Sequence, residues 1–279
     1  MRNSLESTVL VTGATDGLGR SVALELANRG AKVLLHGRSR ERCEAVLEEV
    51  RTETDDEGSR CYLADLSSLD AVRGLAEQIL SEHELLDVLV NNAGLIARER
   101  EETEDGLELT FAVNHLAHFL LTNLLVPLLR DSAPARVVNV SSAGQSPVDF
   151  RNVLLERGYD AMRAYRQSKL AQVMFTFELA ERLRGTEVTT NALHPATLMD
   201  TKMVLETFGR ASSSVREGAE VTVRLAVSPE LEGVTGRYFE GTRKASANRQ
   251  AYDTETRKRL WDLSEKLCGR FLEPLGRRQ

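Results

Sequence analysis

The chain alternates short apolar runs with longer segments of helical period, and this alternation limits the folds that it can form. The runs are TVLVT, KVLLHG, CYLADL, LDVLVNNAG, RVVNVSS and EVTTNALHP, and the helical segments are Leu18–Arg29, Arg40–Arg51, Leu69–Ser81, Thr110–Leu129 and Ala164–Arg184. Strands that are apolar throughout and separated by helices belong to a parallel sheet covered on both faces. We therefore expect a doubly wound α/β fold with about seven strands and helices on both faces.

Length, charge and composition indicate the number of domains and exclude some classes of function. With 279 residues and no linker or repeat, the chain is expected to form a single domain, 1–279. A net charge of -6 argues against general nucleic-acid binding, which needs a basic face. We also expect no membrane span, because no run approaches 18 apolar residues, and a cytoplasmic location, because the polar N-terminus lacks a signal-peptide pattern. Three cysteines without metal-like spacing fit a reducing compartment.

Three glycines follow the first apolar run and open the first helix. Gly13, Gly17 and Gly19 lie in TGATDGLG, a spacing that differs from the widespread G-x-G-x-x-G pattern. Glycine permits a tight turn and close backbone approach, and the N–H groups at a helix start attract an anion. We expect a dinucleotide pyrophosphate here, although ordinary turn glycines are the alternative.

The end of the second apolar run indicates which dinucleotide binds. No carboxylate follows LLHG to accept from a ribose 2′-hydroxyl; Arg38 comes next, with Arg40 nearby. An arginine suits a 2′-phosphate, so NADP(H) is favoured over NAD(H). Asp16 would oppose this if it faced the phosphate, and Arg38 could instead be a solvated loop charge.

Tyr165 and Lys169 lie four residues apart in a segment of helical period, YRQSK, so both side chains are expected on one helix face. A nearby ammonium favours the phenolate form of a tyrosine, whose pKa is ordinarily about 10. Tyr165 is therefore a candidate general acid/base. The pair alone is weak evidence, because such spacings occur by chance.

The order of the motifs is more specific than any one of them. TGATDGLG, ADL, NNAG, FAVNHLAHF, RVVNVSS, YRQSK and HPAT resemble, in sequence and spacing, the short-chain dehydrogenase/reductase family over about Thr8 to Leu267. The resemblance implies a Rossmann-type fold, an NAD(P)-dependent oxidoreductase, and a substrate-binding segment at about 195–230.

The resemblance also implies residue roles. The catalytic residues would be Asn114, Ser142, Tyr165 and Lys169, with Ser141 packing or capping and Asn114 holding a backbone kink and a water. The cofactor-binding residues would be Gly13, Thr15, Gly17, Leu18, Gly19, Arg38, Asp65, Leu66, Asn91, Ala93, Gly94, Tyr165, Lys169 and Thr197. Asp65 could alternatively cap a helix, and Asn114 could be an ordinary polar helix residue.

Two details resemble the retinol dehydrogenase-like branch of the family: the long gap between Ser142 and Tyr165, and the late segment RLWDLSEKLCG in an expected C-terminal helix at about 254–267. Members act on carbonyls and alcohols, often lipophilic. Trp261 in that helix would pack in the core, or lie near the pocket or a subunit edge. The helices at 110–129 and 164–184 commonly build homodimers and homotetramers in the family, so a homo-oligomer is expected.

The segment HPATLMDT departs from the family pattern. Asp200 stands where the family has a hydroxyl residue that contacts the nicotinamide carboxamide, and Thr201 follows one residue late, so either Thr197 or a shifted register supplies the contact. His115 and His118 have no third ligand placed beside them, and we expect no metal.

The combined hypothesis is an NADP(H)-dependent oxidoreductase that interconverts a carbonyl and an alcohol on a lipophilic small molecule. Two alternatives remain: a cofactor-binding sensor or scaffold without turnover, and a dehydratase or epimerase of the same fold.

Overall fold

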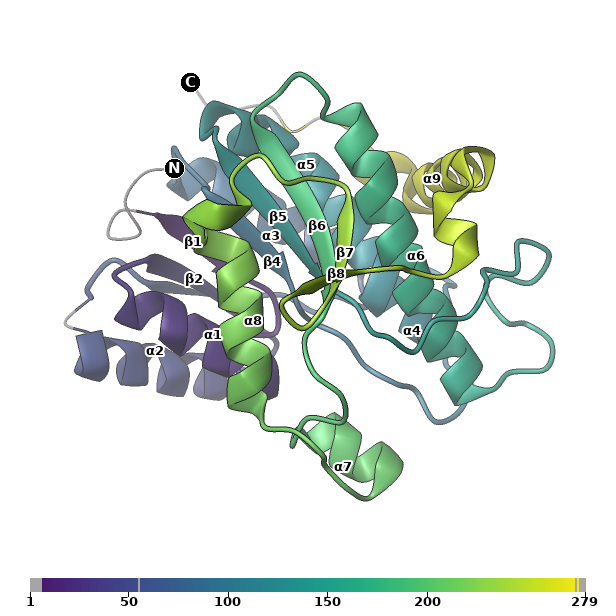
Figure 1. Ribbon diagram of the computed structural model, residues 1–279, viewed down its shortest axis with the longest axis horizontal. Helices are drawn as coiled ribbons and strands as arrows, with labels where there is room; N and C mark the ends of the chain where they lie inside the picture. Colours follow the sequence, from purple (N-terminus) through teal and green to yellow (C-terminus); the bar gives the residue numbers. More distant parts are fainter. Residues whose placement is uncertain (1–6, 55, 274, 276–279) are drawn as a thin grey trace.

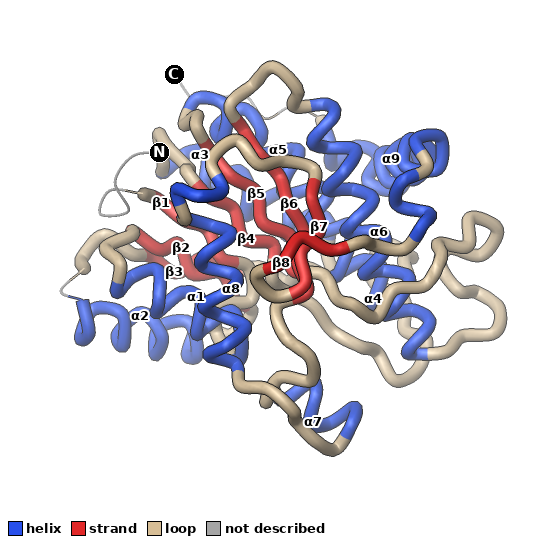
Figure 2. The backbone as a smooth tube through the Cα atoms, viewed as in Figure 1, coloured by secondary structure: helices blue, strands red, loops and turns tan. Residues whose placement is uncertain are grey.

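The computed structural model describes residues 7–54, 56–273 and 275 and contains one eight-stranded sheet, with strand order β3-β2-β1-β4-β5-β6-β7-β8 (Figures 1 and 2). The strands are β1 (Thr8–Val11), β2 (Lys32–Gly37), β3 (Arg60–Leu63), β4 (Val88–Asn91), β5 (Ala135–Val140), β6 (Val188–His194), β7 (Arg237–Glu240) and β8 (Arg243–Ala245). The helices are α1 (Gly17–Asn28), α2 (Arg40–Thr54), α3 (Leu69–Glu82), α4 (Leu109–Phe111), α5 (Ala117–Asp131), α6 (Ala161–Arg182), α7 (Lys202–Phe208), α8 (Val215–Val227) and α9 (Thr254–Cys268).

Strands β1 to β7 are parallel, which confirms the predicted doubly wound α/β fold. Among the strands of the described residues, β8 alone runs antiparallel, against β7. The central strands β1, β4 and β5 are buried along their whole length, because helices cover both of their faces. The short β8 was not predicted. Its sequence, Arg-Lys-Ala, carries two charged residues, which is one of the ways in which exposed edge strands avoid pairing with other chains.

Alternate residues of each strand point into two separate cores. Leu10, Leu34 and Leu89 face the core formed with α3, α5 and α6, whereas Val9, Val33 and Val88 face the core formed with α1, α2 and α8. This period of two places a helix layer on each side of the sheet (Figure 2). The helices begin at capping side chains such as Asp16, Ser68 and Asp160, which accept from backbone N–H groups in the first turn.

The helix predicted at 110–129 is broken by a π-helical turn, η2, at Ala112–Leu116, between α4 and α5. The stretch Leu109–Asp131 is long and apolar enough to cross a membrane by length and composition. However, 83% of its apolar window is buried inside the protein, which is the environment of a core helix in this layer.

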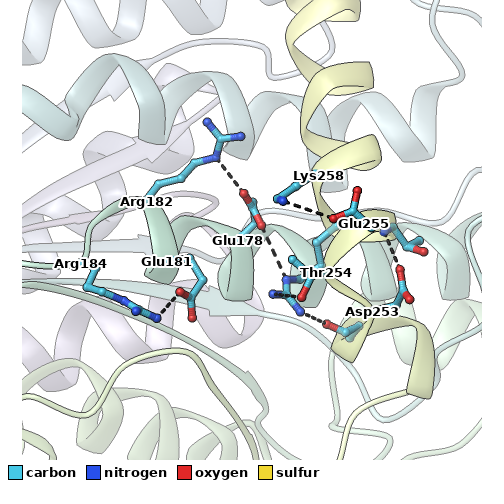
Figure 3. Close-up of polar contacts among 11 residues, drawn as sticks. Glu178, Glu181, Arg182, Arg184, Asp253, Thr254, Glu255 and Lys258 are labelled. Carbon is cyan, nitrogen blue, oxygen red and sulfur yellow. Dashed lines mark hydrogen bonds and ion pairs between the residues drawn. The ribbon is translucent and has the colours of Figure 1, made fainter.

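The C-terminal helix α9 packs on α6. Trp261 is 5% exposed and lies against Phe119 and Phe175, with ring centroids 4.9 and 5.9 Å away, so it packs in the core. The buried Glu178 joins the two helices: its carboxylate lies 3.1 Å from Arg182 Nε on α6 and 3.7 Å from Arg257 Nε on α9 (Figure 3).

The strand order reverses between β1 and β4, which have β2 and β5 as their other neighbours. Loops that leave the carboxyl ends of two such strands run in opposite directions and leave a crevice between them, where ligands bind in folds of this kind. The glycine loop, which is the segment TGATDGLG at residues 12–19, follows β1, and the NNAG segment at residues 91–94 ends β4 and continues beyond it. Both predicted motifs therefore lie at this crevice.

Candidate active site

A cleft of about 660 Å³ lies over the carboxyl ends of the parallel strands. The predicted residues that line it are Gly13, Thr15, Gly17, Leu18, Gly19, Arg38, Asp65, Leu66, Ala93, Gly94, Ser142, Tyr165, Lys169 and Thr197. Asn91 and Asn114 lie beneath it. Residues separated by more than 180 positions in sequence are thus brought to one site by the sheet.

The glycine loop leaves no room for side chains. A Cβ atom on Gly19 would lie 2.1 Å from the carbonyl oxygen of Gly13, and one on Gly13 would lie 3.0 Å from Cα of Ala93. Gly13 and Gly17 also have φ values of +66° and +48°, which side-chain-bearing residues rarely adopt. The loop therefore exposes its backbone at the start of α1, as a bound pyrophosphate requires.

His36 holds the loop from below. Its Nδ1 accepts from the Gly13 N–H at 3.2 Å, and its Nε2 lies 3.2 Å from the Ala64 carbonyl, to which it donates. Burial lowers the pKa of His36 to about 4, so the ring is neutral at pH 7. Nothing in the sequence analysis assigned this role to His36.

Two arginines and two carboxylates surround the end of β2. Arg38 Nη1 lies 3.8 Å from Asp65, and Arg42 Nη1 lies 3.9 Å from Asp16, all four side chains being well exposed. Asp16 also caps α1 by accepting from the Gly17 N–H. Arg42 lines the cleft, whereas Arg40, which the sequence singled out, pairs with Glu44 and does not line it. Each carboxylate here is therefore matched by an arginine that can also reach an anion.

Asp65 does not cap the following helix. Its Oδ1 accepts from the backbone N–H and the hydroxyl of Ser67, while Ser68 caps α3. The hydrogen bonds from Ser67 and the charge of Arg38 outweigh its partial burial and hold the pKa of Asp65 below its usual range. An ionised acceptor is thus fixed at the carboxyl end of β3, beside the buried Leu66.

Asn91 is fully buried and does not line the cleft. Its Nδ2 donates to Asn139 on β5 and to Thr122 on α5, so it fixes the central strands. Its neighbour Asn92, which the sequence analysis did not single out, lines the cleft and donates to the carbonyls of Thr12 and Gly13. Asn92 thereby joins the loop after β4 to the glycine loop.

Asn114 lies in the π-helical turn and is fully buried. Its amide accepts from the Leu95 N–H at 2.8 Å and donates to the Leu95 carbonyl and to Ser168 at 3.0 Å each. These contacts are too many for an ordinary helix surface residue. Asn114 fixes the loop after β4 against α6, directly beside Gly94.

Ser142 and Tyr165 face each other in the cleft. The two adjacent serines differ sharply: Ser141 is buried and donates to the Lys169 carbonyl at 2.7 Å, whereas Ser142 lines the cleft together with Tyr165, and its hydroxyl accepts from the Gly144 N–H at 3.0 Å. Burial raises the pKa of Tyr165 above its usual range, and the nearby Ser142 side chain acts in the opposite direction. This arrangement favours Ser142 over Ser141 as the group that contacts a substrate oxygen.

Lys169 is 4% exposed, and its Nζ lies 5.7 Å from the centre of the Tyr165 ring. The Nζ donates to the Val140 carbonyl and to Gln172 Oε1, each at 2.9 Å. Burial lowers the pKa of Lys169 to about 7. The Lys169 amine can therefore take up a proton, and its ammonium can release one, near neutral pH beside the tyrosine.

The segment HPATLMDT, which departs from the family pattern, places Thr197, Asp200 and Thr201 in three different environments. Thr197 lines the cleft and hydrogen-bonds to His194 at 3.0 Å. Asp200 turns away and accepts from the Val215 N–H at the start of α8. Thr201 caps α7, and its methyl group would lie 3.2 Å from a Cβ atom on Gly17. Both threonines, and not Asp200, therefore face the cleft.

His115 and His118 are each fully buried and hydrogen-bonded to other groups: His115 Nε2 to Ser264, and His118 to Thr12, Asn114 and Gln172. Within the described residues, no group of three or more His, Cys, Asp or Glu side chains is placed to hold a metal ion.

A strand-order reversal, a glycine loop without side chains, and Ser142, Tyr165 and Lys169 in one cleft are the features of a dinucleotide-dependent oxidoreductase of the Rossmann type. The family model described as short chain dehydrogenase matches residues 7–210. The chain is 42% identical to human retinol dehydrogenase 13 and 41% identical to the mouse protein, in each case over 94% of this chain and 84% of the relative. It therefore belongs to the short-chain dehydrogenase/reductase family and resembles the retinol dehydrogenases in it.

Solved structures support the same assignment. An uncharacterised protein from Mycobacterium paratuberculosis has a TM-score of 0.77 at 32% identity, over 94% of this chain and 93% of that one. A short chain dehydrogenase from Escherichia coli CFT073, complexed with NADPH, has a TM-score of 0.71 at 26% identity, over 87% of this chain and 100% of that one.

Proposed function

We propose that this protein is an NADP(H)-dependent oxidoreductase that interconverts the carbonyl group of an aldehyde or ketone and the corresponding alcohol on a lipophilic small molecule. The observation that carries the proposal is the meeting of Ser142 and Tyr165 in the cleft that the glycine loop also lines. The glycine loop fits a dinucleotide because Gly13 and Gly19, at which a Cβ atom would meet neighbouring backbone, keep the loop free of side chains.

When bound, the nicotinamide supplies a hydride to the carbonyl carbon or takes one from the alcohol. The Ser142 hydroxyl and the Tyr165 hydroxyl hydrogen-bond the substrate oxygen, which stabilises the negative charge that develops on it. Tyr165 gives that oxygen a proton during reduction and takes it back during oxidation. The cation of Lys169 beside the tyrosine favours the phenolate that remains.

The preference for NADP(H) rests on Arg38 and Arg42. Both line the cleft at the end of β2, where the adenosine ribose of a dinucleotide lies in this fold, and their guanidinium groups suit a 2′-phosphate. The complex of the Escherichia coli relative with NADPH is in keeping with this preference.

The lipophilic substrate is inferred from apolar side chains that line the cleft. Ile96, Met162, Met203 and Phe208 are among them, and unbranched methionines adapt to long apolar ligands. The naming of the human and mouse relatives as retinol dehydrogenases points to an extended apolar alcohol or aldehyde of similar character.

The cytoplasmic location and the homodimer or homotetramer are further parts of the proposal. Helix α9 packs on α6, one of the two helices expected at the subunit interface (Figure 1). A subunit interface on this side would therefore involve α9 itself, or the parts of α5 and α6 that α9 does not cover. Light scattering at several protein concentrations tests the assembly, and a monomer at all of them would contradict it.

The proposed activity is tested by NADPH consumption with aliphatic, aromatic and long-chain aldehydes and ketones, with NADH in parallel. We expect consumption with the long-chain or aromatic carbonyls and a lower KM for NADPH than for NADH. Binding of NADPH without consumption in either direction would favour a sensor. Product formation without net cofactor oxidation would favour a dehydratase or epimerase.

A further inference from the structure

A line of buried polar side chains runs from the catalytic lysine through the core to the glycine loop. Its members are Lys169, Gln172, His118 and Thr12, which are 4%, 1%, 0% and 0% exposed. Their contacts are Lys169 Nζ to Gln172 Oε1 at 2.9 Å, Gln172 Nε2 to His118 Nδ1 at 3.1 Å and His118 Nε2 to Thr12 Oγ1 at 3.4 Å. Thr12 Oγ1 in turn accepts from the N–H groups of Asn92 and Ala93 at 2.9 and 3.0 Å.

The direction of each hydrogen bond in this line follows from Lys169, the donor at its first end. In its protonated form Lys169 only donates, so Gln172 then presents its carbonyl oxygen to Lys169 and its NH₂ group to His118. His118 Nδ1 then accepts, which leaves the ring proton on Nε2. That proton points to the Thr12 oxygen, which it shares with the two N–H groups above, while the Thr12 hydroxyl donates to the Val90 carbonyl at 3.3 Å. Burial lowers the pKa of His118 to about 3, so the ring carries no second proton at pH 7.

His118 has an alternative partner. Its Nδ1 also lies 3.1 Å from the Asn114 carbonyl, to which it could donate only in the other tautomer. The ring therefore has two neutral arrangements, and the amide orientation of Gln172 selects between them. The titratable groups that face this line are Tyr165 on α6, His115 on the π-helical turn and His36 on β2.

We propose that Gln172 and His118 are positioning residues that hold the Lys169 ammonium beside Tyr165 and couple its place to the NNAG and glycine loops through Thr12. The inference rests on the proposed function for the role of Lys169, but the hydrogen-bond polarity does not. A purely apolar contact would fill the same space, yet it would leave Lys169 without one of its two buried acceptors.

The polarity is tested by ¹⁵N NMR of the histidine rings in the native protein, without substrate or cofactor. The chain has five histidines, and a His118→Gln variant assigns the resonance of His118. We expect the Nε2–H tautomer in the native protein and the Nδ1–H tautomer in Gln172→Met, where the Asn114 carbonyl becomes the remaining partner. An Nδ1–H tautomer in the native protein would overturn the proposal, whether or not the protein is active.

The coupling to chemistry is tested by the pH dependence of alcohol oxidation, in which Tyr165 must lose its proton. Gln172→Met removes an acceptor from the Lys169 ammonium and so lowers the pKa of Lys169. The loss of the neighbouring positive charge raises the pKa of Tyr165. The rising limb of the plot of oxidation rate against pH should therefore move to higher pH by about half a unit or more. Gln172→Glu adds a negative charge beside the ammonium, and the limb should move to lower pH.

The matched control is Gln167→Met. Gln167 is also buried on α6, but its amide bonds the backbone of Asp149 and Val153 and does not touch Lys169. We expect no displacement of its pH limb. Equal displacements in Gln167→Met and Gln172→Met, or displacements of the same sign in Gln172→Met and Gln172→Glu, would overturn the positioning role.

Discussion

Gly19 lies so close to Gly13 that a Cβ atom at position 19 would be 2.1 Å from the Gly13 carbonyl oxygen. This contact is with backbone, which cannot rotate away as a flexible side chain could. The glycine loop and the first turn of α1 are therefore packed against each other with no space for a methyl group, and the loop's shape depends on the absence of side chains.

Gly19→Ala is expected to displace the loop and to weaken NADPH binding by tenfold or more, measured by the change in nicotinamide fluorescence on titration. Gly74→Ala is the control, because Gly74 lies within α3 and a Cβ atom there would meet nothing within 4 Å. That substitution should raise stability by about 0.5–1 kcal/mol through helix propensity. Equal NADPH affinities in the two variants would contradict the account of the loop.

Arg42→Ala should raise the Kd for NADPH roughly tenfold or more and leave the Kd for NADH nearly unchanged, because a hydrogen bond to a charged group contributes about 1.5–3 kcal/mol. Arg38→Ala should behave in the same way. Arg40→Ala is the matched control, since Arg40 pairs with Glu44 outside the cleft. A similar loss with NADH would indicate that these arginines do not read the 2′-phosphate.

Trp261→Ala should lower the free energy of unfolding by about 3–5 kcal/mol, as expected for removal of a buried aromatic side chain. The loss arises because the ring packs against both Phe119 and Phe175, which also contact each other, and because the Arg182 guanidinium carbon lies 4.0 Å from the centre of the Trp261 ring. Denaturant unfolding measures it. Leu205→Ala, at a side chain 48% exposed, should change stability by less than about 0.5 kcal/mol; an equal loss at both positions would contradict the anchoring role of Trp261.

Stability should fall steeply as the pH falls below about 6.5. Burial lowers the pKa values of His36, His115 and His118 to about 4, 3 and 3, so the unfolded chain binds these protons at a higher pH than the folded protein does. Between about pH 6.5 and 4 the unfolded state therefore binds more protons, and each histidine contributes a loss approaching 1.4 kcal/mol per pH unit.

The variant that checks this dependence is His115→Leu. His115 lies among aromatic rings with its Nδ1 unpaired in the structure, and Ser264 retains its bond to the Leu260 carbonyl without it. The substitution should leave the free energy of unfolding at pH 7 little changed. Below pH 6.5 it should reduce the slope of that free energy against pH by up to about 1.4 kcal/mol per pH unit, the contribution of one histidine. Denaturant unfolding at pH 7 and pH 5 measures both, and an unchanged slope would contradict the assignment.

The sequence predicted the fold well because the signals that specify it are local. The all-apolar strands and the helices between them required only hydrophobic periodicity, and the Tyr165 and Lys169 spacing required only one helix turn. Thr197 and Asp200 could not be placed in the same way, because the direction of each side chain depends on turns between β6 and α8.

Other contacts were missed for physical reasons. Strand alternation places Asn91 with Leu89 on the α5 side of β4, and this pattern could have indicated that Asn92 is the neighbour facing the cleft. Arg42 reaches the cleft from α2 through the packing of two elements, which no local pattern reveals. The helical period did not indicate the π-helical turn at Asn114; only the family resemblance implied a backbone kink there.

The most direct test of the central claim is transfer of deuterium from NADPH labelled at the reactive C4 position of the nicotinamide. The product alcohol of the best carbonyl substrate is then examined by mass spectrometry and NMR, with the native protein and Tyr165→Phe. We expect one deuterium on the carbon that bore the carbonyl oxygen, and a rate at least about a hundredfold lower in Tyr165→Phe. An unlabelled product, or an equal rate in the variant, would contradict hydride transfer with Tyr165 as the proton donor.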